Sequence, residues 1–139
     1  MSSFLEMTSL GWGQAEKTTQ VDVVTIDDFC AKNGISKIDI LKSDTQGFDF
    51  EVLKGSAQLM ERNKISLIYL EVMFSAMYRG LPRFDEMYRF LLDRNFTLVT
   101  FYTFHYQEGR AGWTDALFIN NDFHQAWKAR RDAGQRVTI

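Results

Sequence analysis

The stretch LKSDTQGFDFEVLKG, residues 41–55, places an acid, an amide and a glycine directly behind a short apolar run. That run, residues 38–41, is typical of a strand that is buried on both faces. The polar turn that follows it contains Asp44, Gln46 and Gly47. Such a turn either only connects a strand to a helix, or it forms the rim of a reaction site. The surrounding sequence has to decide between these two interpretations.

The rest of the chain alternates between short apolar runs, typical of strands, and stretches with one apolar face, typical of amphipathic helices. The predicted elements, in chain order, are a strand over 21–24, a helix over 25–33 that Thr25 caps, a strand over 38–41, a helix from Phe48 that Gly55 and Ser56 interrupt, a strand over 65–72, a helix from Pro82 to Asn95, strands over 96–102 and 116–119, and a short basic helix over 123–131. Residues 1–20 form a loosely patterned lead-in. This order predicts an α/β sheet of parallel strands, with an antiparallel hairpin from the last two strands at its edge.

The composition is that of a folded domain. Of the 139 residues, 45% are apolar and 24% are charged, which is enough for one domain over residues 1–139 with a core of its own. The formal net charge of −2 gives no general attraction to nucleic acid or to an anionic membrane. No segment approaches the roughly 18 apolar residues of a membrane span, and the N-terminus lacks the pattern of a signal peptide. The single cysteine, Cys30, excludes an internal disulfide and favours a cytoplasmic protein.

Two further features are weaker pointers to function. GWGQAEKT, residues 11–18, nearly matches the phosphate-binding loop G-x-x-x-x-G-K-[ST]. Glu16 stands where that loop needs a glycine, and its carboxylate would repel phosphate. The two histidines, His105 and His124, lie far from any second pairing of an acid with a histidine, so no metal site is predicted.

Two acids stand where predicted strands end. Asp44 directly follows one apolar run and Glu71 lies near the end of the next. In open α/β sheets, ligands bind outside the carboxyl ends of the strands, so both acids fall where chemistry is expected. A purely structural interpretation has Gly47 permitting the turn and Asp44 capping the next helix. That interpretation leaves Gln46 without a role, and it does not explain a carboxylate in an otherwise apolar strand.

Three stretches together resemble the FkbM-type methyltransferase family. They are TIDDFCAKNGISKIDILKSDTQGFDFEVLKG (25–55), IYLEV (68–72) and WTDALFIN (113–120). The family typically reads T-L-D-D, then K-x-D-x-[EQ]-G-x-E-x-x-V-L-K-G, then an acidic strand end and a final D-A-L-F strand. The matching residues are Thr25, Asp27, Asp28, Lys42, Asp44, Gln46, Gly47, Val52, Leu53, Lys54, Gly55, Glu71, Asp115, Ala116, Leu117 and Phe118. Asp49 stands in place of a glutamate, and Gln46 takes the place of the commoner glutamate, which keeps the hydrogen bonding and removes the charge.

The resemblance implies a partial Rossmann-like methyltransferase sheet with helices on both faces. It also implies an enzyme that uses S-adenosylmethionine to methylate a hydroxyl group of a sugar or another small molecule. Such a transfer needs an aligned acceptor oxygen and often a base that removes its proton. Asp44 and Glu71 are the catalytic candidates, for orienting or deprotonating the acceptor.

The resemblance also suggests binding residues. Asp44, Gln46 and Gly47 would line the pocket on the side of the cofactor. Tyr78 and Arg79 follow the next strand and would reach the small-molecule acceptor.

The glycine-rich turn of dinucleotide-type folds, G-x-G-x-x-G, does not occur in this sequence. We therefore expect the chain to correspond to the C-terminal portion of the methyltransferase fold and to lack the N-terminal half that binds the cofactor. The strand over 38–41 would then lie at an exposed edge of the sheet. Because such an edge can pair with the same edge of a second copy, we expect a homodimer. The alternative function is a non-catalytic half-domain that dimerises or binds a partner.

Overall fold

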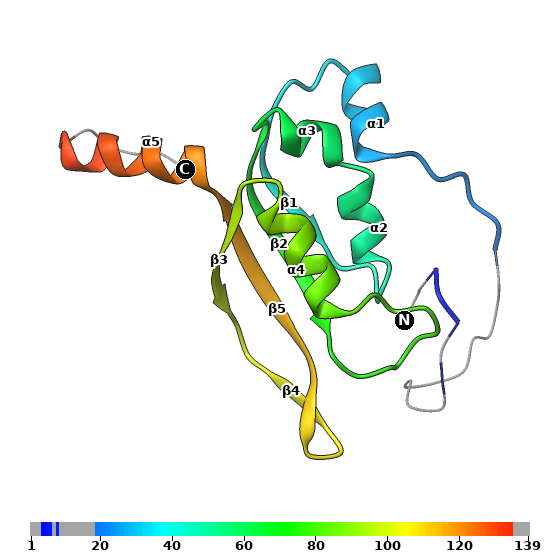
Figure 1. Ribbon diagram of the computed structural model, residues 1–139. Coiled ribbons are helices and arrows are strands. Elements are labelled where there is room, and N and C mark those ends of the chain that lie inside the picture. Colours follow the sequence, from blue (N-terminus) through cyan, green and yellow to red (C-terminus); the bar gives the residue numbers. More distant parts are fainter. Residues whose placement is uncertain (1–3, 7, 9–18, 135–139) are drawn as a thin grey trace.

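The fold is a mixed sheet with helices (Figure 1), seen in a computed structural model that describes residues 4–6, 8 and 19–134. The predicted strand–helix order is confirmed from residue 25 onward. The elements are α1 (Ile26–Lys32), β1 (Ile38–Ser43), α2 (Asp49–Lys54), α3 (Ala57–Glu61), β2 (Ile65–Met73), α4 (Phe84–Leu92), β3 (Phe96–Phe101), β4 (His105–Gln107), β5 (Arg110–Asn120) and α5 (Asn121–Asp132). The near-match to a phosphate loop at residues 11–18, and most of the lead-in, lie outside the described residues.

The strands are hydrogen-bonded in the order β1-β2-β5-β3, and β4 pairs with β5 as well. The pair β1–β2 is parallel, whereas β5 runs antiparallel to each of its neighbours. The α/β class and the antiparallel C-terminal hairpin are thus confirmed. The expectation of a mainly parallel sheet is wrong in detail, because β5 inserts between β2 and β3 and leaves one directly bonded parallel pair among the described strands.

The hairpin between β4 and β5 turns through two residues with positive φ. Glu108 has a φ of 51° and Gly109 a φ of 76°. Two-residue hairpin loops need such left-handed residues to match the twist of the flanking strands. Part of the region between the two predicted strands is therefore an extension of the sheet.

The core lies on one face of the sheet. Alternate residues of β2 and β5 point to this face, and the fully buried set includes Ile68, Leu70, Val72, Ala116 and Phe118. Helices α2, α3 and α4 cover it with buried apolar side chains, and α1 adds a partly buried one. These side chains are Ile26, Leu53, Met60, Met87 and Leu91. Burial of such side chains is the main favourable term in folding, so this face carries most of the stability.

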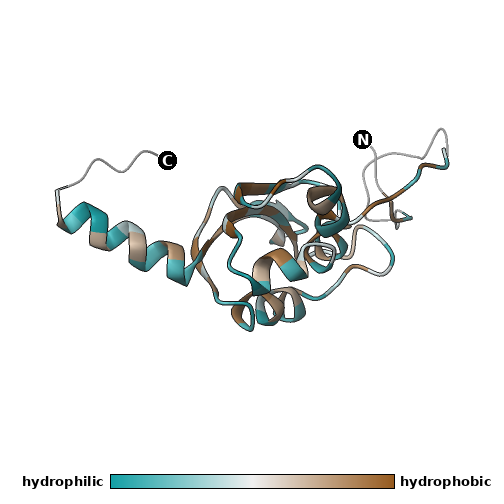
Figure 2. Ribbon diagram, turned by 90° about the horizontal axis from the view of Figure 1, so that it is seen from above, coloured by the Kyte–Doolittle hydropathy of each residue, from teal (hydrophilic) through white to brown (hydrophobic). Residues whose placement is uncertain are grey.

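The opposite face of the sheet is more open. Leu67, Tyr69 and Leu117 are only half-buried there, and Ile40 is 54% exposed. Figures 1 and 2 both show α5 running away from the sheet, and none of its residues is buried. Within the part of the chain that the structure describes, the helices that enter the core all pack on one side. The expectation of helices on both faces is therefore wrong for this part.

The predicted strand at 21–24 is absent. This segment has no regular structure, and Val21, Val23 and Val24 are 61%, 63% and 66% exposed. β-Branched residues favour an extended backbone, but a strand also needs a neighbour to bond to. The helix that follows begins as predicted, with the Thr25 hydroxyl oxygen accepting a hydrogen bond from the backbone N–H of Asp28 at 3.0 Å.

Helix α1 is tied to α3 by the Asp27 carboxylate. Its two oxygens accept hydrogen bonds from the backbone N–H groups of Gln58 and Leu59, each at 3.0 Å. These N–H groups belong to the first turn of α3, where no intrahelical acceptor is available. Asp27 therefore caps a helix that lies some thirty residues further along the chain.

Replacing Asp27 with alanine should lower the free energy of unfolding by about 1–2 kcal/mol, because two helix-terminal N–H groups lose their acceptor. Urea denaturation followed by circular dichroism measures the change. Asp28→Ala is the matched control, since Asp28 is an exposed acid in the same turn of α1. Its loss should stay below about 0.5 kcal/mol. Equal losses in the two variants would contradict the capping role of Asp27.

Candidate functional site

The candidate site lies at the carboxyl ends of β1 and β2. The two strands are parallel and in register, with Lys42 opposite Tyr69 and Ser43 opposite Leu70. The next residue along each strand path is an acid, Asp44 on one side and Glu71 on the other. Parallel pairing therefore brings two acids that are far apart in sequence to the same edge, as the sequence predicts.

The turn between β1 and α2 is held together by Asp49. This side chain is 1% exposed. Its Oδ1 accepts hydrogen bonds from the Ser43 hydroxyl at 2.5 Å and from the Thr45 backbone N–H at 3.2 Å. Its Oδ2 accepts one from the Gly47 backbone N–H at 3.3 Å. Asp49 thus holds the turn together, and α2 has no side-chain cap, so Asp44 does not cap the helix as the structural interpretation expected.

Gln46 and Gly47 both adopt left-handed backbone conformations, with φ values of 54° and 96°. A Cβ atom on Gly47 would lie 2.7 Å from Leu81 Cδ2, 3.2 Å from Leu5 Cδ1 and 3.3 Å from Tyr78 Cδ2. Glycine is therefore required here both for its backbone freedom and for the close packing of its neighbours.

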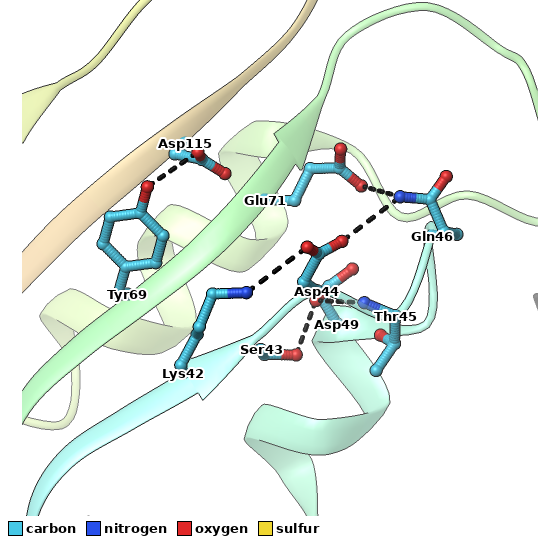
Figure 3. A network of polar contacts seen from close by, with 9 residues as sticks. All are labelled: Lys42, Ser43, Asp44, Thr45, Gln46, Asp49, Tyr69, Glu71 and Asp115. Carbon is cyan, nitrogen blue, oxygen red and sulfur yellow. Dashed lines mark hydrogen bonds and ion pairs between the residues drawn. The ribbon is translucent and has the colours of Figure 1, made fainter. Parts of the chain in front are cut away.

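The Gln46 side chain connects the acids of the site (Figure 3). Its Nε2 donates to Asp44 Oδ1 and to Glu71 Oε2, at 3.2 Å in each case. Its Oε1 accepts a hydrogen bond from the Tyr78 hydroxyl at 3.2 Å. The other carboxylate oxygen of Asp44 pairs with Lys42 Nζ at 3.3 Å. One network therefore contains four of the predicted site residues, Asp44, Gln46, Glu71 and Tyr78, together with Lys42.

The pKa of Glu71 is raised from its ordinary value to about 7. The main cause is burial, since the residue is only 8% exposed and the charged form is poorly solvated. The negative charges of Asp44, Asp49 and Asp115 raise the pKa further, and Lys42 offsets part of the effect. A carboxyl group with a pKa near 7 can take up and release a proton at neutral pH.

Besides Asp44, another acid lies next to Glu71, and it belongs to β5. Asp115 is the direct cross-strand partner of Glu71, and its Oδ2 accepts a hydrogen bond from the Tyr69 hydroxyl at 2.7 Å. This bond and the negative charge of Asp115 raise the pKa of Tyr69 to about 12. Asp115 was not predicted as a site residue, although the D-A-L-F signature contains it. Its approach to Glu71 depends on the register between β2 and β5, which a single sequence does not reveal.

The two predicted substrate residues behave differently. Tyr78 is buried and joins the network through Gln46. Arg79 is exposed, and its guanidinium lies 3.8 Å from the Glu6 carboxylate. Its backbone N–H also donates to the Glu6 carbonyl at 2.8 Å. The structure therefore brings together Asp44, Gln46, Gly47, Glu71 and Tyr78, and it places the Arg79 side chain apart from them.

A segment near the N-terminus covers one side of this site. Leu5 packs against the cluster of Met73, Met77 and Tyr78. The backbone N–H of Thr8 donates to the Met77 carbonyl at 2.8 Å, which fixes the segment along the chain that follows β2. No pattern in the sequence marks this contact, because a single leucine in a Ser- and Thr-rich stretch carries no periodicity.

The site includes a small depression with room for about one water molecule. It is lined by Gly47, Asp49, Glu71, Val72, Met73, Leu81, Pro82, Phe84 and Met87. Pockets that enclose a cofactor-sized ligand usually start at about 300 Å³. The described residues therefore do not enclose a pocket of that size at this place.

Two other kinds of site are absent from the described part of the chain. None of its helices is both long and apolar enough to cross a bilayer. The described residues also contain no group of three or more His, Cys, Asp or Glu side chains placed to hold a metal ion.

Comparison with known proteins adds one match. The model of a family described as the methyltransferase FkbM domain matches residues 2–98, which is more than half of the chain. No curated protein and no solved structure matches the chain. The matched region contains the turn between β1 and α2 and all of β2, so the predicted resemblance is confirmed at the level of the family. The chain belongs to the FkbM methyltransferase domain family.

Proposed function

We propose that this chain takes part in the methylation of a hydroxyl group on a sugar or another small molecule, with S-adenosylmethionine as the methyl donor. The observation that carries the proposal is the placement of Asp44 and Glu71 at one strand edge, joined through the amide group of Gln46. S-Adenosylmethionine supplies an electrophilic methyl group on a positively charged sulfur. An edge with several carboxylates suits that charge. A cytoplasmic location is part of the proposal, because the one cysteine of the chain is a buried free thiol.

Asp44 and Glu71 have different proposed roles toward the acceptor hydroxyl. Asp44 is held by Lys42 and Gln46, so its carboxylate offers a fixed acceptor that can orient the substrate hydroxyl. Glu71 is the candidate base, since its raised pKa of about 7 lets it take the hydroxyl proton near neutral pH. With the cofactor bound, the acceptor oxygen would bond to the methyl carbon as the carbon–sulfur bond breaks and S-adenosylhomocysteine leaves. The hydroxyl proton would pass to a carboxylate oxygen of Glu71. The Tyr78 hydroxyl donates to Gln46 Oε1 and so joins the same network.

Replacing Glu71 with glutamine should reduce kcat/KM for methyl transfer about 100-fold or more, because the amide cannot accept the proton. Transfer from labelled S-adenosylmethionine to a panel of sugars and hydroxylated small molecules measures the loss. The wild-type rate should fall as the pH drops below about 7, where Glu71 becomes protonated, and this limb should be missing in Glu71→Gln.

The matched control is Glu51→Gln, which removes an exposed acid on α2 that pairs with Lys54. Its rate should stay within about twofold of the wild type, because exposed ion pairs contribute little. Binding of S-adenosylmethionine, measured by calorimetry, should be similar in all three proteins. A folded wild-type chain that neither binds the cofactor nor transfers a methyl group would contradict the proposed function.

A second candidate function is a non-catalytic half-domain that pairs with a second copy of itself. The observation that favours it is the place of β1 at one edge of the sheet, with Ile40 exposed. Regular, unprotected edges invite pairing with another strand. The opposite edge, β3, contains an irregularity between Leu98 and Thr100, and such bulges discourage pairing. We therefore propose β1 as the contact between two copies.

Under this second proposal, Ile40→Lys should convert a dimer to a monomer, because a charge at the contact opposes close packing of the two copies. Light scattering coupled to size exclusion measures the mass of each protein. Val99→Lys is the control, since Val99 is similarly exposed on the other edge, and its mass should equal that of the wild type. A monomeric wild-type chain would exclude the dimer.

A further inference from the structure

The Gln46 side chain contacts both acids of the site and Tyr78. Its two amide hydrogens are directed to Asp44 Oδ1 and Glu71 Oε2, and its carbonyl oxygen receives the Tyr78 hydroxyl. An ionised carboxylate only accepts hydrogen bonds, whereas a phenol can donate one. The chemistry of the three partners therefore fixes which end of the amide faces which partner.

A glutamate at this position would reverse the electrostatics. An ionised glutamate could still accept the hydrogen bond of the Tyr78 hydroxyl, but it cannot donate to either acid, and it would place a third carboxylate between two others. The glutamine side chain has nearly the same shape, carries no charge and donates to both acids. Hydrogen bonds to an ionised carboxylate lower its affinity for a proton.

The surroundings of Glu71 otherwise favour its protonated form. Acids face it from the turn after β1, from α2 and from β5, and one cation of β1 opposes them, while the Tyr78 phenol lies on the far side of Gln46. These groups are Asp44, Asp49, Asp115 and Lys42. Most of the nearby charge is therefore negative, and Gln46 provides neutral donors in the same place.

We propose that Gln46 is a positioning residue that holds Asp44 and Glu71 as a pair and keeps Glu71 able to lose its proton at neutral pH. The proposal deepens the proposed function, on which its catalytic consequence rests. Without the donated hydrogen bond, Glu71 stays protonated until a higher pH and cannot serve as the base. With it, the two acids remain at a fixed separation and face the same acceptor.

The test is a titration of Glu71 by carbon NMR of the full chain labelled at its glutamate carboxyl groups. In Gln46→Met, which has a similar length and no donor, the midpoint of Glu71 should rise by about one pH unit. Gln46→Glu should raise it further, because a negative charge replaces the donor. All three side chains sit at the same left-handed backbone position, so differences between them do not come from the backbone.

Two further variants make the result decisive. Tyr78→Phe keeps the ring and removes the hydroxyl that donates to Gln46 Oε1, so it should raise the midpoint by a smaller amount than Gln46→Met. Gln58→Met changes an exposed glutamine on α3 and should leave the midpoint unchanged. An unchanged midpoint in folded Gln46→Met and in Tyr78→Phe would overturn the proposal.

This experiment separates the inference from the proposed function, because the midpoint is measured without substrate. A raised midpoint in a chain that transfers no methyl group would uphold the role of Gln46 and contradict the enzymatic proposal. In an active chain, the acidic limb of the pH–rate profile should move upward in Gln46→Met together with the midpoint. An active chain whose profile and midpoint stay fixed in that variant would contradict the role of Gln46 alone.

Discussion

The buried carboxylate of Asp49 is the interaction on which the site depends. It accepts hydrogen bonds from the Ser43 hydroxyl and from two backbone N–H groups of the turn, at Thr45 and Gly47. A buried carboxylate is costly unless such donors surround it, so the turn and the acid stabilise each other. Because Asp49 takes up these N–H groups, the Asp44 side chain does not have to cap the turn. It instead contacts Lys42 and Gln46, where it can meet a ligand.

The parts of the fold with strong local patterns could be predicted from the sequence. The apolar run of β2, the stripe of α4 and the cap at Thr25 each follow from spacing within a few residues. The segment 21–24 has the local pattern of a strand but no neighbour to pair with, which a local pattern cannot reveal. The open face of the sheet could not be predicted for the same reason, since it depends on which helices pack against which side.

The candidate site, too, could be predicted from the sequence only in part. The approach of Asp44 to Glu71 could be predicted, because the carboxyl ends of parallel strands share an edge. The role of Asp49 was missed, since its position in the motif gives no sign that its oxygens bond to the turn before it. Asp115 was missed as a site residue because its distance from Glu71 depends on the antiparallel register of β2 with β5. The direction of the Arg79 side chain, toward Glu6, could not be predicted because loop residues lack a period that fixes their direction.

Strand alternation connects the one-sided core to the chemistry of the site. Val72 points into the core, so its neighbour Glu71 must point to the opposite, more open face, where Asp115 stands across from it. A slip of one residue in the register would bury the acid among apolar side chains and expose Val72, which the cost of an unpaired buried charge forbids. The same constraint that stabilises the sheet therefore sets the surroundings of Glu71. Its proton affinity is raised by burial and by the nearby acids, and the amide of Gln46 donates a hydrogen bond to it in the same surroundings.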